Sequence, residues 1–412
     1  MNDLPSYLSN TSDPVNVNGK DVHCPMYADD IILLSKSAKG LQEKLDIHVL
    51  NTYCKDWCLT VNTSKTKILV FNNAGRLNKH RFRYGNENIE CVSNCKYLGI
   101  WFSSSGSYSY AQNELYKKSL KVFFKLKKDL LSLNPNIRTS MHVFDHTIKP
   151  ILLYGSDIWG MFNPFTVKCK KENPSFDNIY SGSLCEKIHL KFCKFILGVH
   201  KRTTNIAVLS ELGRFPLYFN IIKCMLLYWY RLENLGKEFP LLKEAYNETK
   251  LLYLSKKPTW YESINIIVNI LKTTNTDINL LLKNTLGKFK NNVNIFLKSL
   301  FITEWKKQIN QFSDSKLKIY NICKNNFGLE KYLTIVNNFE LRRSFTKLRT
   351  SSHRLQIELG RYQGVPRHNR VCTKCSSNII EDELHILFEC SKYDEDRESM
   401  LFELTTVVTL EI

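Results

Sequence analysis

The sequence predicts a mixed α+β protein, with a strand-rich amino-terminal part followed by a mostly helical remainder. Three observations predict this class. Residues 1–103 hold short apolar runs separated by Gly, Asn and Ser, a pattern typical of strands and turns. From residue 104 onward, apolar residues recur at helical spacing among lysines. Near the carboxyl end, three cysteines and one histidine have a spacing suited to zinc.

Two adjacent carboxylates, Asp29 and Asp30, are the most informative residues of the strand-rich part. Apolar residues flank them, with Met26 before and Ile31–Leu34 after. Burying two unpaired charges in an apolar strand would cost roughly several kcal/mol each. A tight hairpin avoids this cost by carrying both carboxylates at its tip. At this point two interpretations remain open: a Mg²⁺ site, because carboxylate oxygens suit that ion, or a surface turn with two solvated aspartates.

After this hairpin the sequence predicts a helix and then further strands. Ser37 is expected to cap the helix, and its apolar residues recur every four positions. They are Leu41, Leu45, Val49, Tyr53 and Trp57, with Cys54 and Cys58 beside them as predicted buried thiols. A strand is predicted over residues 68–71 and ends at Asn72 to Gly75. Residues 82–84 and 89–92 flank a predicted hairpin turn, and residues 96–102 form one more predicted strand.

This order of elements resembles the reverse transcriptases of non-LTR (LINE-type) retrotransposons. The resemblance is carried by Tyr27-Ala28-Asp29-Asp30, the helix, the loop with Lys65, the strand and Tyr97-Leu98-Gly99. Later segments look like those that follow the catalytic domain in jockey-like elements. They are Ile151–Ser156, Trp159, Ile196–Val199 and Leu209–Arg214. The resemblance implies a polymerase palm, an antiparallel sheet with hairpin and helix, followed by a helical thumb.

The resemblance also implies site residues. Asp29 would be the main ligand of two Mg²⁺ ions at the transferred phosphate, and Asp30 an auxiliary one. Tyr27 would lie near the primer or the incoming nucleotide, and Lys65 would neutralise or protonate the leaving pyrophosphate. The strand with Tyr97, Leu98 and Gly99 resembles the primer grip. From residue type alone, Lys65 is equally consistent with a solvated loop lysine, and the strand with plain sheet core.

The resemblance further implies that a partner aspartate lies on an earlier strand. Only 26 residues precede Tyr27, and Asp13 lies in a loop-like stretch. We therefore expect a carboxy-terminal portion of a retrotransposon protein, without the fingers and the first catalytic strand, and inactive by itself. The alternative function is a non-catalytic RNA- or DNA-binding remnant.

Four parts are predicted along the chain: a palm remnant over 1–103, a helical thumb over 104–160, a helical region over 161–340 and a CCHC zinc-binding-like module over 341–412. The thumb pattern alternates lysines with Leu120, Phe123, Phe124, Leu126 and Leu130. This pattern serves a template–primer grip or an ordinary amphipathic helix equally. Asn163 to Gly182 are predicted to form a loop, and Pro216, Pro240 and Pro258 separate helices, one with the periodic run Ile221, Met225, Leu226, Tyr228, Trp229 and Leu232.

Cys372, Cys375, His385 and Cys390 have the spacing C-x2-C-x9-H-x4-C. Thiolates and imidazole suit tetrahedral Zn²⁺. His385 and Cys390 lie five apart in a helix-like segment, so they need a slight break to reach one ion. The alternative is a small core of reduced thiols. Because Glu381-Asp382-Glu383 precede the histidine, nucleic-acid contacts are expected elsewhere, from Arg354, Arg361, Arg367, Arg370 and Lys374.

Composition is consistent with a polyanionic partner. The 412 residues carry a net charge of +19, which favours a polyanionic partner. The resemblance to reverse transcriptases implies that this partner is an RNA template with a DNA primer, and that dNTPs are the small-molecule substrates. The 13 scattered cysteines indicate reduced thiols. A polar amino terminus, and apolar runs well short of 18 residues, predict no membrane insertion and an intracellular protein, in cytoplasm or nucleus. His142 and His146 share a helix face but lack the glutamate of a zinc protease, so a structural or solvent-facing role is expected.

Overall fold

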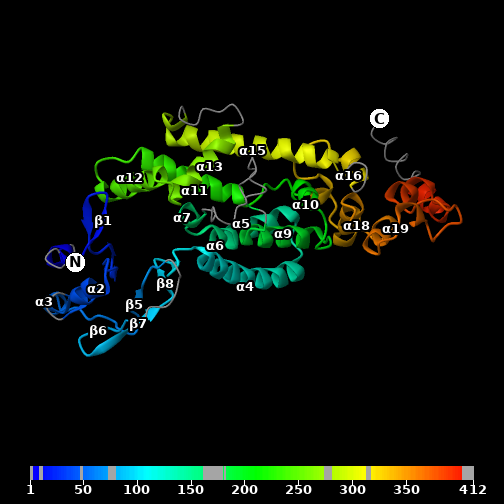
Figure 1. Cartoon of the computed structure of the whole chain (residues 1–412). Coiled ribbons are helices and arrows are strands. Elements are labelled where there is room, and N and C mark those ends of the chain that lie inside the picture. The colour runs from blue at the N-terminus through cyan, green and yellow to red at the C-terminus, as the bar shows by residue number, and fades with distance from the viewer. Residues whose placement is uncertain are drawn as a thin grey trace. The chain divides into compact units, whose positions relative to one another are not determined.

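The computed structural model describes residues 3–8, 13–46, 50–72, 80–160, 180, 182–272, 281–311 and 317–400 (Figure 1). The chain divides into two compact units. Unit 1 comprises Met1–Phe124, Thr147–Cys185 and Tyr218–Phe296. Unit 2 comprises Lys125–His146, Glu186–Leu217 and Leu297–Ile412. Each unit therefore combines segments that are far apart in the sequence.

The strands belong to unit 1 and form small sheets. Antiparallel pairs join β1 (Val15–Val17) to β2 (Lys20–Val22), β3 (Met26–Tyr27) to β4 (Asp30–Ile31), and β8 (Asn94–Tyr97) to β9 (Ile100–Ser103). A three-stranded sheet has the order β5 (Lys67–Leu69), β7 (Glu87–Val92), β6 (Phe82–Tyr84). β6 and β7 form the predicted hairpin.

The prediction of an antiparallel palm sheet is corrected in two respects. The described strands form four separate sheets, and β5 pairs with β7 in parallel. The β6–β7 hairpin occupies one edge of β7 and leaves the other edge for β5. The predicted strand over 96–102 is also wrong, since Leu98 and Gly99 form the turn between β8 and β9, both with left-handed φ angles of 46° and 84°.

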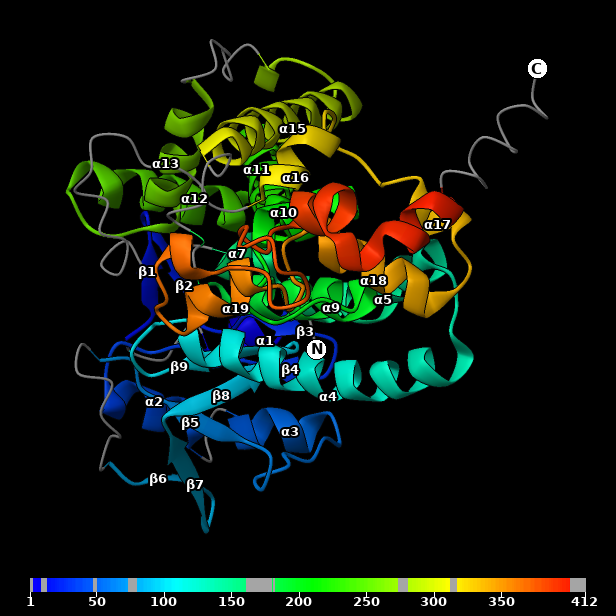
Figure 2. The ribbon, with the colours of Figure 1, turned by 90° about the vertical axis from the view of Figure 1, so that its right-hand side faces the viewer.

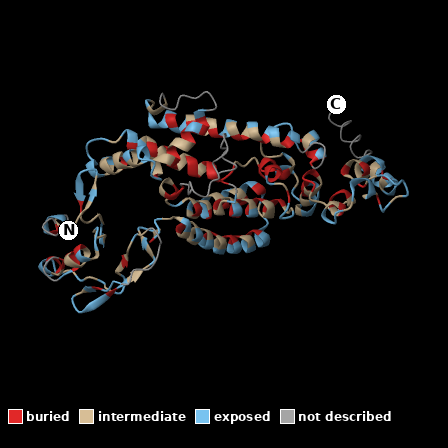
Figure 3. Cartoon of the chain, in the orientation of Figure 1, coloured by how far each residue is buried: buried red, intermediate tan, exposed pale blue. Residues whose placement is uncertain are grey.

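The helices of unit 1 are α1 (Leu4–Leu8), α2 (Ala38–Leu45), α3 (Thr52–Asp56), α6 (Lys149–Leu153), α7 (Ser156–Trp159), α11 (Tyr218–Glu233), α12 (Pro240–Leu254) and α13 (Trp260–Lys272). α11 confirms the predicted period: Ile221, Met225, Leu226, Trp229 and Leu232 are buried. Pro240 begins α12 at its first turn, where a missing N–H costs nothing. Figure 3 shows the resulting buried stripes along the helices.

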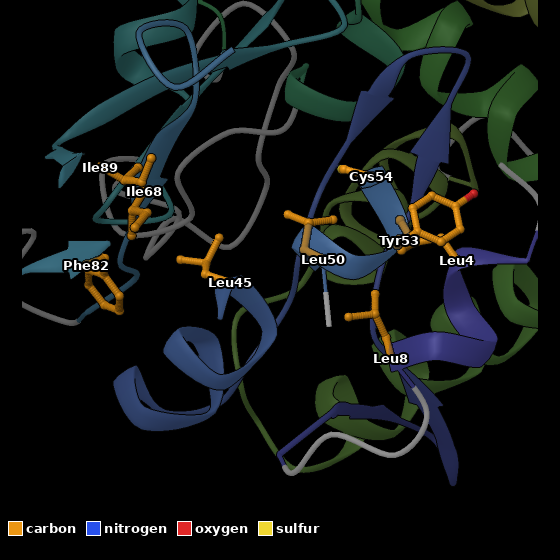
Figure 4. Close-up of a cluster of buried hydrophobic side chains, with 9 residues drawn as sticks. All are labelled: Leu4, Leu8, Leu45, Leu50, Tyr53, Cys54, Ile68, Phe82 and Ile89. Carbon is orange, nitrogen blue, oxygen red and sulfur yellow. The ribbon is translucent and has the colours of Figure 1, made fainter. Parts of the chain in front are cut away.

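A core cluster of unit 1 joins the amino-terminal helices to the three-stranded sheet (Figure 4). Ile68, Phe82 and Ile89 come from the sheet, Leu4, Leu8, Tyr53 and Cys54 from α1 and α3, and Leu45 and Leu50 lie between them. Met26 and Ile31 of the β3–β4 pair pack against this cluster. The apolar residues that flank the two aspartates are therefore anchored in a core.

The single helix expected after Ser37 is two helices, α2 and α3. Ser37 caps α2 as predicted, because its side chain accepts a hydrogen bond from the Gly40 amide. The predicted stripe fails at its end: Trp57 is 54% exposed, and Cys58 is exposed rather than buried. A four-residue repeat drifts by about 40° per step around a helix of 3.6 residues per turn, so the stripe cannot keep one face. Val49 lies outside the described residues.

Three long helices cross the boundaries between the units: α4 (Ser109–Leu133), α9 (Leu184–Leu197) and α15 (Leu286–Gln311). α5 (Ile137–Thr147) belongs to unit 2 except for its last residue. The other helices of unit 2 are α10 (Asn205–Glu211), α16 (Lys318–Cys323), α17 (Tyr332–Ile335), α18 (Phe339–Arg349), α19 (Gln356–Tyr362), η2 (Arg367–Asn369), η3 (His385–Glu389) and η4 (Ser391–Tyr393). On α4, Phe123, Leu126 and Leu130 are buried, while Phe124 is exposed. The loop predicted from Asn163 lies almost wholly outside the described residues, as do Asn73 to Gly75.

Across the described helices, none combines the length and the apolar character needed to cross a membrane.

Candidate functional site

The β3–β4 hairpin carries the two aspartates as the sequence predicts (labelled in Figure 2). Tyr27 pairs with Asp30, so Ala28 and Asp29 form a two-residue turn. Ala28 has a left-handed φ of 54°, as such turns require. The pairing continues below the strands, where the Leu34 amide donates to the His23 carbonyl at 2.7 Å.

The hairpin separates its polar tip from its apolar base. Tyr27 is 66% exposed, and Asp29 and Asp30 are exposed as well. Met26 and Ile31 are half-buried against the core cluster. The tip therefore presents two carboxylates and an aromatic ring to solvent on a backbone fixed from below. Among the described residues, these carboxylates do not join a third Cys, His, Asp or Glu close enough to share a metal ion.

Tyr97, at the end of β8, lies within electrostatic range of the hairpin. Partial burial, and then the negative charge of Asp30, raise the pKa of the Tyr97 hydroxyl. This places one residue of the predicted primer grip near one of the two aspartates, within unit 1. Its neighbour Leu98 is partly exposed at the turn.

Tyr154 holds the turn that follows Tyr97. Its hydroxyl donates to the Leu98 carbonyl at 2.7 Å. Its ring presses on Gly99, where an added Cβ would lie 2.8 Å from Tyr154 Cε1. Tyr154 belongs to the Ile151–Ser156 segment on which the resemblance partly depends. The structure gives this segment a physical role, because its tyrosine clamps the β8–β9 turn.

Lys65 lies in an exposed turn whose backbone is fixed by Asn62, since the Lys65 amide donates to Asn62 Oδ1 at 3.1 Å. Its catalytic role stays a prediction.

Lys44 supports the hairpin from inside the unit, and sequence reasoning missed it. The side chain is fully buried, and Nζ donates to the Leu34 carbonyl at 2.5 Å. Burial lowers the pKa of Lys44, while the charge of Asp13 opposes that shift. Asp13 itself has a lowered pKa because Ser37 donates a hydrogen bond to it. A lysine in a helix normally indicates a solvent face, so no pattern in the sequence predicted this contact.

The four predicted zinc ligands come together in unit 2. Their ligand atoms all lie within 4.8 Å of one another. Cys372 Sγ is 3.9 Å from Cys390 Sγ, and Cys375 Sγ is 3.4 Å from His385 Nε2. Two ligand atoms on a tetrahedral zinc ion lie about 3.5–3.8 Å apart, given zinc–sulfur and zinc–nitrogen bonds of roughly 2.3 and 2.1 Å. The donor set and its dimensions therefore fit Zn²⁺.

Two backbone contacts fix the segments that carry these four side chains. The Lys374 amide, within the C-x2-C segment, lies 3.4 Å from Cys372 Sγ. η3 is a π-helix, in which the Cys390 amide donates to the His385 carbonyl five residues earlier at 2.8 Å. This is the break that the five-residue spacing predicted, and such single π turns are typical of functional sites.

The thiols differ in acidity. Hydrogen bonds from Ser377, with a further one from His385, lower the pKa of the Cys375 thiol to about 6. Burial raises the pKa of Cys390. A metal ligand must be a thiolate, so zinc would displace the proton of Cys390 on binding.

The acidic residues before His385 are structural. Glu381 is buried, and its carboxylate accepts from the Gln356 amide at the start of α19 at 2.8 Å. Asp382 accepts from the His385 amide at 2.9 Å. Glu383 accepts from Ser351 Oγ at 2.9 Å and lies 2.7 Å from His353 Nε2. Together these bonds fix the segment that carries His385 and connect it to the residues before it.

Of the basic residues predicted to contact nucleic acid, Arg370 is half-buried. Its guanidinium donates to the Val365 and Ile357 carbonyls, both at 2.9 Å, and so serves the fold. Arg361 pairs with Glu358. Arg354, Arg367 and Lys374 are exposed.

The segment Leu209–Arg214 is a structural centre of unit 2 that residue type alone did not reveal. Glu211 is fully buried and pairs with Arg349 at 3.0 Å, and Arg349 also pairs with Glu330 at 3.1 Å. Arg214 binds both oxygens of Asp145, at 2.6 and 3.2 Å. Gly213 touches the backbone of residue 329 so closely that a Cβ would lie 2.4 Å from its nitrogen.

His142 and His146 lie together on α5 as predicted, with ring centroids 4.0 Å apart. His146 Nδ1 lies 2.9 Å from the His142 carbonyl. Within the described residues, neither belongs to a cluster that could hold a metal.

Two comparisons with known proteins found similarities. Residues 1–102 match the family model "Reverse transcriptase (RNA-dependent DNA polymerase)". The chain is also similar to "Probable RNA-directed DNA polymerase from transposon BS" of Drosophila melanogaster, at 31% identity over 148 residues. That match covers 33% of this chain and 16% of the relative. Residues 1–102, which include the aspartate hairpin, are thus similar to a reverse transcriptase domain.

Proposed function

We propose that this chain serves an RNA-directed DNA polymerase of a non-LTR retrotransposon, and that the β3–β4 hairpin holds its catalytic Mg²⁺. The observation that carries the proposal is the exposed Asp29–Asp30 pair on an anchored hairpin, inside the segment that matches the reverse transcriptase model. Carboxylate oxygens are the ligands that Mg²⁺ prefers, and Mg²⁺ retains several waters beside one or two carboxylates. The exposed tip has room for such a hydrated ion.

The position of each hairpin residue suggests its role in the proposed reaction. Asp29, at the turn, would be the main ligand, and Asp30, on β4, the auxiliary one. The bound ions would stabilise the attacking and leaving oxygens of an in-line displacement at phosphorus. The exposed ring of Tyr27 offers a face on which a nucleotide can stack, and Tyr97 borders Asp30 where a primer end would lie. Lys65 would offset charge on the leaving pyrophosphate.

We further infer that the 412-residue chain, assayed alone, does not extend primers. A two-metal site needs carboxylates from more than one strand, and the hairpin pair has no third acidic partner among the described residues. Extension of oligo(dT) on poly(rA) with Mg²⁺ or Mn²⁺ should stay at background. Robust extension that Asp29→Asn abolishes would overturn the inference of inactivity and support the catalytic assignment.

Metal binding at the hairpin can be tested without polymerisation. Fe²⁺ in place of Mg²⁺, with ascorbate and peroxide, cuts the backbone near its ligands, and mass spectrometry locates the cuts. We expect cleavage close to residue 29 that excess Mg²⁺ suppresses and Asp29→Asn removes. Asp21→Asn is the matched control, because Asp21 is an exposed strand residue of the separate β1–β2 hairpin. Equal cleavage in the wild type and Asp29→Asn would refute the metal site.

A second candidate function, non-catalytic nucleic-acid binding, is favoured by α4. Lys117, Lys118, Lys121, Lys125 and Lys128 are exposed on it. Lys127 instead lies over the Phe195 ring at 5.4 Å. Charge reversal at Lys125 and Lys128 should therefore weaken RNA and DNA binding at low salt, and reversal at Lys127 should also disturb packing. Binding that does not change with salt would contradict this electrostatic interpretation.

We also propose that Cys372, Cys375, His385 and Cys390 hold one structural Zn²⁺. Four protein ligands leave no open coordination position, so the ion would organise the segment and perform no chemistry.

A further inference from the structure

An exposed aromatic ring in unit 2 lies close to two guanidinium groups. Tyr362, the last residue of α19, is 48% exposed. The guanidinium carbons of Arg202 and Arg361 each lie 5.4 Å from the centroid of its ring. Arg361 is also held by Glu358, whereas Arg202 projects from an exposed turn. An exposed ring flanked by arginines is the arrangement on which an unstacked base can lie.

Further basic residues surround this ring. Lys201 precedes Arg202 in the same exposed turn. Arg343 of α18 donates through Nε to the Gly198 carbonyl at 3.1 Å, which brings α18 beside that turn. Burial, and then the positive charges of Arg343 and Arg354, lower the pKa of Lys347. We name Lys201, Arg202, Arg343, Lys347, Arg354 and Tyr362 the basic–aromatic surface.

Negative charge offsets this surface only weakly at α18. Glu340, one turn before Arg343 on the same helix, lies 3.8 Å from it, and the glutamate side chain is 72% exposed. An ion pair that long and that exposed is worth little, because water screens it. Arg343 therefore keeps most of its attraction for a phosphate.

A chain of hydrogen bonds connects this surface to the four-ligand cluster. The Arg202 turn is held by Ser352, whose Oγ accepts from the His200 amide and from Thr203 Oγ1, both at 2.9 Å. The residues on either side, Ser351 and His353, are held by Glu383. Glu383 precedes the ligand His385 by two residues. The positions of the turn and of the metal-binding segment are therefore coupled.

We propose that the basic–aromatic surface binds single-stranded nucleic acid and that the zinc centre positions it through Glu383. A base stacks on Tyr362, and Lys201, Arg343, Lys347 and Arg354 contact neighbouring phosphates. Duplexes do not fit this surface as well, because their bases are stacked on each other and cannot reach a ring. The zinc ligands are mostly buried and make no contact with the strand. This proposal does not depend on polymerase activity.

The experiment measures fluorescence anisotropy of the full chain with a labelled single strand and with a duplex of equal length. Tyr362→Ala should weaken single-strand binding about fivefold or more, the lower end of what stacking one base supplies, and leave duplex binding within about twofold. Tyr362→Phe keeps the ring and should bind as the wild type does. Phe239→Ala is the matched control, because Phe239 is similarly exposed (46%) but lies at the start of α12 in unit 1. Unchanged single-strand binding in a folded Tyr362→Ala, or an equal loss on duplex, would overturn the proposal.

The coupling has its own readout. Glu383→Gln should weaken single-strand binding while the chain retains one equivalent of zinc by metal analysis. Chelation should weaken the wild type further, because Tyr362 itself lies in the segment that zinc is expected to organise. If Glu383→Gln retains its zinc and binds the single strand as the wild type does, the positioning role of Glu383 is refuted while the surface itself stands.

Discussion

The aspartate hairpin and the cysteine–histidine cluster are both four-residue motifs, and they are built in opposite ways. The hairpin exposes its carboxylates at a turn, and the residues beside them pack against the core. Its backbone is therefore fixed while the two carboxylates stay exposed to solvent. The cluster buries three of its four ligands, and the acidic residues before His385 bond to neighbouring segments. A substrate can reach the exposed carboxylates of the hairpin, whereas the mostly buried cluster contributes to the fold. The first arrangement suits catalysis and the second suits structure.

The largest expected effect concerns the cysteine–histidine cluster. Cys375→Ser, or a strong chelator, should unfold the segment from about residue 355 to 400, because structural zinc supplies on the order of 10–16 kcal/mol in small zinc domains. Limited proteolysis should then cut this segment first and leave unit 1 intact. Cys323→Ser is the control, since Cys323 is exposed on α16. A chelated chain that resists protease like the untreated one would show that the cluster is a reduced-thiol core.

A second prediction asks whether unit 2 depends on buried charge as well as on metal. Arg349→Met should cost roughly 3–5 kcal/mol, because it leaves the buried carboxylate of Glu211 without its partner. Urea unfolding followed by tryptophan fluorescence would measure the loss. Arg138→Met, at an exposed site on α5, should change stability by less than about 0.5 kcal/mol. Equal midpoints for the two variants would contradict a stabilising network.

The third prediction concerns the β8–β9 turn, which follows Tyr97. Gly99→Ala should destabilise unit 1 through its left-handed φ and through the clash with the Tyr154 ring. Gly106→Ala isolates the second cause, because Gly106 also has a positive φ but has nothing within 4 Å of an added Cβ. We expect Gly99→Ala to cost about 1–3 kcal/mol more than Gly106→Ala, in the range of overpacking. Thermal unfolding compares the two, and equal midpoints would show that Tyr154 does not clamp the turn.

Local patterns in the sequence predicted part of this contrast. Apolar runs around two adjacent carboxylates predicted the aspartate hairpin, and the spacing of the three cysteines and the histidine predicted both their clustering and the break that became η3. Prediction failed where partners are distant. Glu211 and Arg349 are separated by 138 positions, and Lys44 finds its acceptors only after α2 packs. A buried charge looks like a solvated one until the fold brings its partner, so these supports could not be predicted from spacing.

The smallest effect is a pH dependence in the core below the hairpin. Burial, and the hydrogen bond from its hydroxyl to Asp3, raise the pKa of Tyr53 to about 12. Because the pKa of Tyr53 is higher in the folded state than its ordinary value near 10, this residue stabilises unit 1 at any pH below about 10. That contribution is lost as the pH rises from about 10 toward 12. Tyr53→Phe should cost about 1 kcal/mol at neutral pH, from one lost hydrogen bond. Its unfolding midpoint should then fall less than that of the wild type between about pH 10 and 12. Parallel pH curves for the two proteins would show that the Tyr53 hydroxyl does not stabilise the core beneath the aspartate hairpin.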